Sequence, residues 1–243
     1  MRIKLTLEYD GTDYVGWQLQ PNGVSVQQQV ELALEQLLGV AVRVHSSGRT
    51  DAGVHALGMV CHLDTERELP LTAWREGLNR YLPPAIVIRE AESVSDEFHA
   101  RFSARGKFYR YTLLRDEVRS PLQRLTSWQV RQPLDLEAMR AAAAFFVGFH
   151  DFSAFRTSGC AAETTRREIF SLELLEDGRL LYIDVRGSGF LKNMVRMMVG
   201  TLVEVGRGKR PVTDIDRLLC GGSDTAPALT APAHGLCLQE VWY

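Results

Sequence analysis

The chain has 243 residues and a mass of 27.3 kDa, which suits one large domain or two of roughly 100–120 residues each. A hydrophobic share of 45% and a charged share of 24% are those of an ordinary globular protein and exclude global disorder. The net charge of −2 and the pI near 6.3 argue against a nucleic-acid partner only as a whole-chain sum, because a partner meets one patch of the surface.

The cysteines and the N-terminus predict a cytoplasmic protein without a membrane partner. Cys61, Cys160, Cys220 and Cys237 lie far apart and form no CxxC pair, which disfavours a disulfide framework or a cysteine zinc site and suits a reducing compartment. The first residues alternate as in a strand and do not resemble a signal peptide. No apolar run approaches the ~18–20 residues that a membrane span needs.

Charge is distributed unevenly along the chain. Residues 1–100 hold eight basic and fourteen acidic side chains, whereas residues 101–131 hold eight basic and two acidic ones. Residues 186–210 add six basic side chains against Glu204 alone. Only four of the 28 basic residues are lysines, and arginine both pairs with phosphates and stacks on bases. The two basic segments indicate a surface for a polyanion such as RNA; solvated faces are the alternative.

The first half of the chain predicts the element order β-α-β-β-α-β. Residues 2–9 alternate as a half-buried strand, and a capping box of Ser25 and Gln28 opens an apolar helical stripe that stops at Gly39. The later elements are expected as strands at 40–44 and 57–63, a helix at 72–81 that ends before Pro83-Pro84, and a strand at 85–89.

The second half predicts the same order. Its elements are expected as a strand at 107–114, a helix at 135–147, a hairpin of strands 168–176 and 179–186, a long helix from Phe190 to Gly206, a short helix at 213–220 and a strand at 235–242. We therefore predict an α+β protein of two ferredoxin-like halves, residues 1–104 and 105–243. RNA-recognition modules share this order, but a fold alone does not establish a function.

The segment with the strongest indication of chemistry is residues 46–55, which joins two alternating strands and is longer than the 2–5 residues of a routine hairpin. Arg49 stands two residues before Asp51 and favours an ionised carboxylate, as a nucleophile or base requires. The alternative to a catalytic role is a structural one, in which Asp51 forms an Asx-turn within its own loop. A metal site of His45, Asp51, His55 and His62 competes, although no pair has the HExxH spacing. Two-carboxylate glycosidase chemistry needs a second acid that is not near in sequence.

Two further segments combine aromatic, basic and glycine residues. Residues 98–111 interleave aromatic and basic side chains, which suits base stacking with phosphate neutralisation. Strand alternation places Lys107, Tyr109 and Tyr111 on one face and Phe108 and Arg110 on the other, although a strand tyrosine is more often core.

The third segment is Gly187-Ser188-Gly189, which is expected to open a helix with Lys192 and Arg196 on one face. Arg196 stands among apolar residues, so it either snorkels or pairs with a buried acid, for which Asp51 is the natural candidate.

Taken together, these segments resemble the tRNA pseudouridine synthase A family. The resemblance runs through Tyr9-Asp10-Gly11, Gly16-Trp17-Gln18, Ser25-Val26-Gln27, Gly48-Arg49-Thr50-Asp51-Ala52-Gly53-Val54-His55, Leu78-Asn79, Leu82-Pro83, Phe98-His99-Ala100-Arg101-Phe102-Ser103-Ala104, Tyr109-Arg110-Tyr111, Phe190-Leu191, Met194-Val195-Arg196, Ala231-Pro232-Ala233 and Gly235-Leu236. The segment at 48–55 is highly specific, and the order of the others makes coincidence implausible.

The resemblance implies an isomerase that converts uridine to pseudouridine at positions 38, 39 and 40 in the anticodon stem-loop of tRNA. It implies that Asp51 is the catalytic aspartate, that Tyr109 contacts the target base, that Arg196 pairs with Asp51, and that Arg49 helps to open the stem or to steady the flipped nucleotide. Lys107 and Arg110, which flank Tyr109, are expected to bind substrate as well.

The resemblance also implies a homodimer with tRNA lying across both subunits and with no cofactor or metal. The two halves are expected to join into one mixed, mainly antiparallel sheet with helices on one face and a central catalytic cleft. Two other classes remain as alternatives: a non-catalytic RNA-binding protein on the same fold, and a metal-dependent nuclease using His45, Asp51 and His55.

Overall fold

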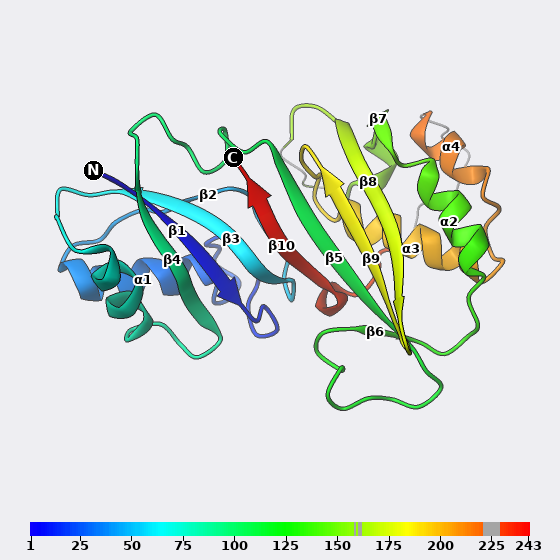
Figure 1. Cartoon of the computed structure of the whole chain (residues 1–243), viewed down its shortest axis with the longest axis horizontal. Coiled ribbons are helices and arrows are strands. Elements are labelled where there is room, and N and C mark those ends of the chain that lie inside the picture. The colour runs from blue at the N-terminus through cyan, green and yellow to red at the C-terminus, as the bar shows by residue number, and fades with distance from the viewer. Residues whose placement is uncertain (158, 160–161, 221–228) are drawn as a thin grey trace. The chain divides into compact units, whose positions relative to one another are not determined.

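A computed structural model describes residues 1–157, 159, 162–220 and 229–243, and these form two compact units (Figure 1). Unit 1 comprises Met1–Arg105 with Cys237–Tyr243, and unit 2 comprises Gly106–Leu236. The first division of the chain thus falls one residue after the expected break at 104, and the final strand, expected in the second half, clusters with unit 1. The α+β class with mixed, mainly antiparallel strands is confirmed.

Unit 1 has the ferredoxin-like arrangement that its sequence predicts. Its elements are β1 (Arg2–Tyr9), α1 (Val26–Leu38), β2 (His45–Ser46), β3 (His55–Asp64), the π-helix η1 (Ala73–Gly77), β4 (Ile86–Val94) and β10 (Leu236–Trp242). Strand β1 lies between β4 and β3 and is antiparallel to both. Strand β3 also pairs with β2 in antiparallel and with β10 in parallel orientation.

The core of unit 1 follows from the two periodicities of its sequence. In β1, Ile3, Leu5, Leu7 and Tyr9 are buried while the intervening residues are half-buried. Helix α1 buries a stripe that includes Val26, Val30, Leu34 and Leu38, and in Figure 1 it lies behind the strands. The predicted caps are confirmed: the Ser25 hydroxyl accepts from the Gln28 amide, and Gly39 ends the helix with φ +75°.

Unit 2 contains the second pass of elements. These are β5 (Gly106–Arg115), β6 (Trp128–Val130), α2 (Leu136–Ala144), β7 (Gly148–Asp151), the short 3₁₀ helix η2 (Ser153–Phe155), β8 (Arg166–Asp177), β9 (Leu180–Gly187), α3 (Met194–Gly206), α4 (Asp214–Leu219) and the 3₁₀ helix η3 (Ala233–Gly235). The antiparallel sheet order is β5-β9-β8-β7, and β6 pairs in parallel with β5. The predicted hairpin turn lies between β8 and β9, where Gly178 has φ +57°.

One predicted strand is absent: residues 40–44 form no strand, and the short strand β2 begins only at His45. The helix expected at 72–81 is confirmed over residues 71–79, with a π-helical middle at Ala73–Gly77. The strands β6 and β7 were not predicted, because three or four residues carry too little periodic signal.

The start of α3 differs from the prediction in a way that affects the site. The helix begins at Met194 and not at the glycine turn, because Asn193 adopts a left-handed conformation with φ +61°. Residues 187–189 therefore do not open this helix. The exposed Lys192 lies before the helix and does not share a face with Arg196.

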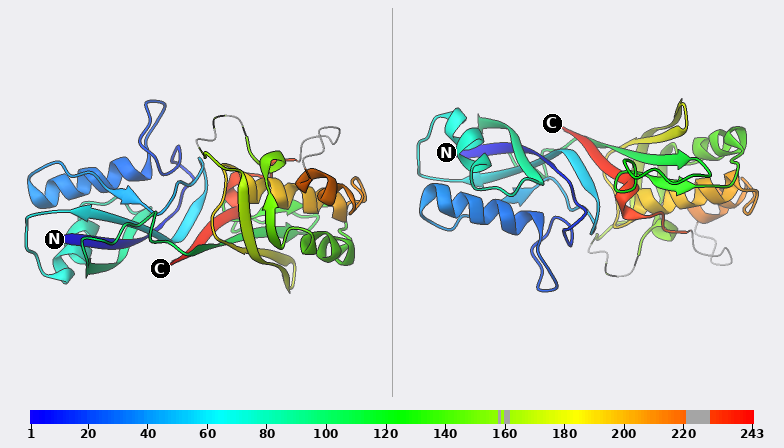
Figure 2. Two further views of the ribbon diagram at one scale, coloured as in Figure 1. Left: turned by 90° about the horizontal axis from the view of Figure 1, so that it is seen from above. Right: turned by 90° about the horizontal axis from the view of Figure 1, so that it is seen from below.

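An exposed hairpin separates β1 from α1, and it projects from unit 1 as the blue loop in both views of Figure 2. The Val15 amide donates to the Val24 carbonyl at 3.0 Å, and an isolated bridge joins Gln20 to Gly23. Residues 18–24 are all exposed.

In the described parts of the chain, no helix has the length and apolarity that a bilayer crossing requires. Cys61 is buried and Cys220 is exposed, and these two form no disulfide with each other or with Cys237. Cys160 lies outside the described residues.

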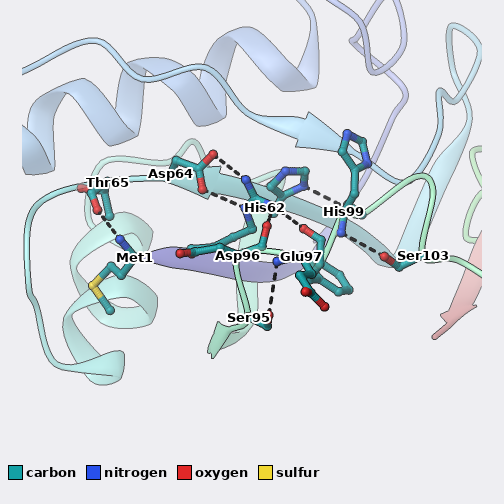
Figure 3. A network of polar contacts seen from close by, with 12 residues as sticks. Met1, His62, Asp64, Thr65, Ser95, Asp96, Glu97, His99 and Ser103 are labelled. Carbon is teal, nitrogen blue, oxygen red and sulfur yellow. Dashed lines mark hydrogen bonds and ion pairs between the residues drawn. The ribbon is translucent and has the colours of Figure 1, made fainter.

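Three histidine rings, those of His45, His62 and His99, cluster at one end of β3, and Figure 3 shows two of them, His62 and His99. The His62 ring stacks on His45 with centroids 5.2 Å apart and meets His99 edge-on at 4.7 Å. Its Nδ1 accepts the Ala100 amide at 3.1 Å, and only 1% of the residue is exposed. Burial, followed by His99 and Arg2, lowers the pKa of His62 to about 4, so the ring is neutral in the native state.

This depressed pKa predicts acid destabilisation. The unfolded chain takes up a proton on His62 near pH 6.5 and the native state only near pH 4, so stability present above pH 6.5 is lost as the pH falls toward 4. At pH 5 this group costs about 2 kcal/mol relative to pH 7. We expect His62→Asn, whose amide oxygen replaces the Nδ1 acceptor, to reduce by that amount the difference in urea unfolding free energy between pH 7 and pH 5. An unchanged difference contradicts the assignment.

Candidate active site

The Asp51 loop runs between β2 and β3 in unit 1. Ser47 and Thr50 are buried, Arg49 and Ala52 are exposed, and Asp51 is half-buried. The Ser47 amide donates to the Val60 carbonyl at 2.8 Å, which fixes the start of the loop on β3. The loop thus places its carboxylate at the boundary between core and solvent.

Residues 10–17, which follow β1, contact this loop on both sides of Asp51, and we call them the brace. The Trp17 amide donates to the Thr50 carbonyl at 3.1 Å, and the Gly53 amide donates to the Tyr14 carbonyl at 3.2 Å. The buried hydroxyls of Tyr9 and Thr50 lie 2.9 Å apart and form a hydrogen bond. Backbone-to-backbone bonds therefore fix the residues on either side of the carboxylate.

Two glycines allow the brace to touch the loop. A Cβ on Gly11 would lie 2.0 Å from the Val54 carbonyl oxygen, so no other residue fits without movement of the backbone. Gly16 has φ +105°, and a Cβ there would lie 2.5 Å from the Thr50 carbonyl oxygen. No role is predicted for either glycine from sequence, because this contact is non-local; their occurrence in two of the family segments is the only signal.

His55, at the end of the Asp51 loop, contacts residues 10 and 11 of the brace. Its Nδ1 accepts the Gly11 amide at 3.1 Å and lies 3.1 Å from an Asp10 oxygen. Burial opposes ionisation of Asp10, but hydrogen bonds from the Thr12 hydroxyl and amide lower its pKa below the usual range. Asp10 and His55 thus belong to the support of the loop.

The metal-site alternative is not supported by the arrangement of its residues. His55 contacts Gly11, whereas His45 and His62 stack on each other. Within residues 1–157, 159, 162–220 and 229–243, no group of three or more histidine, cysteine, aspartate or glutamate side chains is arranged to hold a metal ion. The alternatives of a metal centre and of a metal-dependent nuclease therefore gain no support from the described residues.

Unit 2 contributes Tyr109, on strand β5. The residue is 8% exposed, and its ring meets Phe190 edge-on with centroids 5.2 Å apart. Lys107, two residues earlier on the same strand, is half-buried.

The next residue on this face, Tyr111, is fully buried and donates its hydroxyl to the Pro232 carbonyl at 2.7 Å. Burial raises the pKa of Tyr111, so the hydroxyl stays protonated.

Arg110 lies on the other face of β5 and has a structural partner. Its Nε and Nη2 each lie 2.7 Å from one carboxylate oxygen of Asp184, which is 1% exposed. The guanidinium also lies 4.6 Å from the centre of the Tyr182 ring. A bidentate pair with a buried carboxylate indicates that Arg110 holds β5 to β9, and its predicted contact with substrate gains no support from this geometry.

Arg196 is half-buried on α3 and is held by two acceptors. Its Nε donates to the Ala231 carbonyl and its Nη1 to the Asn193 side-chain oxygen, both at 2.7 Å. Asn193 in turn donates to the Thr157 hydroxyl at 2.8 Å. Among the described residues, Asn193 is the one non-glycine residue with positive φ, a conformation that costs free energy and concentrates at functional sites. Sequence reasoning missed Asn193, since its role depends on this backbone angle.

The chain after residue 228 completes the support of Arg196. The Ala231 amide donates back to the Arg196 carbonyl at 3.1 Å. Farther along α3, a Cβ on Gly200 would lie 1.7 Å from the Leu229 carbonyl oxygen, so the glycine permits this close approach. The site residues that the sequence predicts are divided between the two units. Asp51 and Arg49 belong to unit 1, whereas unit 2 contains Lys107, Tyr109, Arg110 and Arg196.

Comparison with known proteins identifies the class. Residues 6–103 and 142–243 match a family model described as tRNA pseudouridine synthase. This match defines an RNA-modifying isomerase.

Whole-chain relatives agree with the family match. The chain is 59% identical to a protein of Syntrophotalea carbinolica over 99% of this chain and 96% of the relative, and 57% identical to one of Citrifermentans bemidjiense over 99% and 97%. It is 51% identical to one of Myxococcus xanthus over 100% and 92%. Each relative is named tRNA pseudouridine synthase A. The chain belongs to the tRNA pseudouridine synthase family and isomerises uridine in tRNA.

Among solved structures, the chain is similar to a chain in the crystal structure of a Cbf5-Nop10-Gar1 complex. The TM-score is 0.37 at 15% identity, with 83% of this chain and 45% of that chain covered. This likeness is too distant to support a conclusion about the site.

The brace predicts a specific sensitivity at Gly16. We expect Gly16→Ala to lower kcat/KM about 10²-fold, because the methyl group displaces the Thr50 carbonyl and with it Asp51. The matched control is Gly39→Ala, where φ is also positive at +75° but nothing lies within 4 Å of the added Cβ. Both variants lose about 1–3 kcal/mol of unfolding free energy, but only the first loses activity. Equal activity of the two variants contradicts the role of the brace.

The support of Arg196 predicts that Asn193 acts as a positioning residue. Asn193→Gly keeps the left-handed backbone but removes the acceptor for Arg196, so we expect kcat/KM to fall about tenfold with little change in the thermal midpoint. Asn193→Asp retains an acceptor oxygen and is expected to recover most of the activity. A glycine variant as active as the wild type excludes this role.

Proposed function

We propose that this enzyme converts uridines at positions 38, 39 and 40 of the tRNA anticodon stem-loop to pseudouridine, with Asp51 as the catalytic carboxylate. The observation that carries the proposal is the brace on both sides of Asp51, which fixes a half-buried carboxylate by backbone contacts. The resemblance of residues 48–55 to the family supports the assignment of Asp51, and the names of the relatives support the substrate class.

The reaction conserves all atoms of the uridine. The N1–C1′ bond breaks, the base rotates, and a C5–C1′ bond forms; C5 then loses its proton and N1 gains one. A carboxylate serves this sequence by adding to C6, by adding to C1′, or by removing a proton from C2′. No electrons enter or leave, so the chemistry requires no redox or group-carrying cofactor.

Tyr109 is proposed to contact the flipped base. Extruding a nucleotide from the stem costs a few kcal/mol, and an aromatic ring against the uracil face recovers roughly 1–3 kcal/mol of it. The Tyr109 ring is held edge-on by Phe190, which fixes its plane before substrate arrives. Its hydroxyl is the candidate base for the C5 proton.

The basic residues divide into two proposed roles. Arg196, fixed by Asn193 and Ala231, pairs with Asp51 and keeps it ionised. Arg49, exposed beside Asp51, steadies the opened stem, and Lys107 contacts the RNA near Tyr109. The protein acts as a cytoplasmic homodimer across which the tRNA lies, and light scattering of the free protein tests the dimer.

The test uses tRNA transcripts labelled with [5-³H]uridine at position 38, 39 or 40, or at a position outside the anticodon arm. Wild-type enzyme is expected to release tritium from the first three only. Asp51→Asn is expected to lose activity about 10³-fold or more while tRNA affinity stays within twofold. Asp13→Asn, at an exposed aspartate on the neighbouring segment, is the matched control and keeps full activity.

The outcomes separate the parts of the proposal. An active Asp51→Asn variant excludes Asp51 as the catalytic carboxylate but leaves the substrate assignment standing. Release from labels outside the anticodon arm overturns the position assignment. Because the family resemblance implies an enzyme without a metal, addition of a chelator to the reaction is expected to leave the rate unchanged.

A further inference from the structure

One aromatic side chain on the surface of unit 1 has no role in the site described above. Phe102 is 76% exposed, which makes it the most exposed aromatic residue in the described part of the chain. It lies at the start of the basic segment of residues 101–131, and the guanidinium of the exposed Arg101 lies 5.5 Å from the centre of its ring. An exposed aromatic ring beside an arginine is typical of a surface that binds a partner.

The turn that carries Phe102 is rigid. The His99 Nδ1 accepts the Arg101 amide at 3.1 Å and the Phe102 amide at 3.4 Å. The His99 amide donates to the Ser103 hydroxyl at 3.0 Å, and the Ser103 amide donates to the His99 carbonyl at 2.9 Å (Figure 3). The ring of Phe102 is therefore presented on a preformed turn, which reduces the ordering cost of binding.

The core of unit 1 anchors this turn. The Ala100 amide donates to the buried His62, and the Ala100 carbonyl accepts the Tyr243 hydroxyl at 2.8 Å. Phe102 packs on His99 with centroids 4.3 Å apart, and His99 meets His62, which stacks on His45. Phe102 is thus one end of a continuous series of rings, and His45 at the other end is exposed as well.

A nucleobase fits this surface better than a folded protein does. An aromatic face with an adjacent guanidinium is the combination that binds unpaired bases, by stacking on the ring and by contact of the cation with the backbone. Asp96 and Glu97 lie on the same loop (Figure 3), and they disfavour a dense line of phosphates. Stacking on a neutral base does not suffer this repulsion.

We propose that Phe102 and Arg101 form a second tRNA contact, at which an unpaired base of the substrate stacks on Phe102 outside the catalytic position. The inference rests on the proposed function for its substrate, since a tRNA offers unpaired bases in its loops. A second copy of this chain is the competing occupant.

The experiment measures affinity without turnover, in the Asp51→Asn background, by titration of full-length tRNA. Phe102→Ala is expected to weaken binding about tenfold, within the range of one lost stacking contact. Phe102→Trp is expected to restore wild-type affinity, whereas Phe102→Leu, which is apolar but has no ring, is expected to remain weak. The matched control is Phe149→Ala, at a ring that is 64% exposed in unit 2, and its affinity is expected to stay within twofold of the parent.

Salt dependence separates the ring from the cation. Phe102→Ala is expected to leave the slope of log Kd against log salt unchanged, whereas Arg101→Gln is expected to reduce it by about one charge equivalent. Light scattering identifies the competing occupant: a loss of dimer mass in Phe102→Ala assigns the ring to a protein interface and overturns the proposal. Unchanged affinity of Phe102→Ala, or a Leu variant as tight as the Trp variant, overturns it as well.

These readouts are independent of the proposed function. Tritium release at positions 38–40 tests where the enzyme acts and whether Asp51 is required, and it does not depend on Phe102. The binding series tests Phe102 in protein that does not turn over. A failure of one therefore leaves the other interpretable.

Discussion

The Asp51 loop depends on a contact between two stretches of backbone. Residues 10–17 approach residues 50–54 so closely that a Cβ on Gly11 or Gly16 would overlap a carbonyl oxygen. Hydrogen bonds from Trp17 and Gly53 then fix the relative register of the two stretches. Because amide and carbonyl groups have little freedom once both ends are bonded, the position of Asp51 follows from backbone geometry and not from side-chain rotamers.

Unit 2 uses a different device for the same purpose. Arg196 has a long flexible side chain, and ordering it costs conformational entropy. The Asn193 and Ala231 oxygens bind two of its nitrogens, and Asn193 itself is held by Thr157. Asn193 has an unfavourable left-handed backbone conformation and immediately precedes α3. In this conformation its side-chain oxygen accepts a hydrogen bond from the Arg196 guanidinium. The strained backbone of Asn193 thus allows a hydrogen bond that orders the Arg196 side chain.

The local parts of this structure were predictable from sequence, and the non-local parts were not. Alternation in β1 and β5 identified their buried faces, and the caps of α1 followed from Ser25 and Gly39. The predicted start of α3 was wrong because residues 190–191 continue the apolar pattern of the helix. This pattern does not indicate that Asn193 adopts a left-handed backbone conformation. The strand expected at 40–44 failed because three alternating valines do not specify a pairing partner.

The site showed the same division. The length and composition of residues 46–55 indicated chemistry, and the family resemblance named Asp51. The function of Gly11 and Gly16 became visible only when the opposing backbone was in place, since a glycine in sequence does not reveal what approaches it. Candidate catalytic side chains such as Asp51 are therefore easier to propose from a sequence than the residues that hold them.

The charge argument changes in the same way. The count of basic residues indicated that the segments 101–131 and 186–210 contribute to a surface for a polyanion. Several of these arginines are instead neutralised within unit 2: Arg110 by Asp184, Arg115 by Glu176 and Arg210 by Glu204. Arg101, Arg105, Arg119 and Arg124 are exposed. Since the salt dependence of RNA binding scales with the phosphates that are neutralised, its slope reports the second group and not the total. A chain with a net charge of −2 can therefore bind RNA through a few exposed arginines, because the partner meets a local patch and not the whole-chain sum.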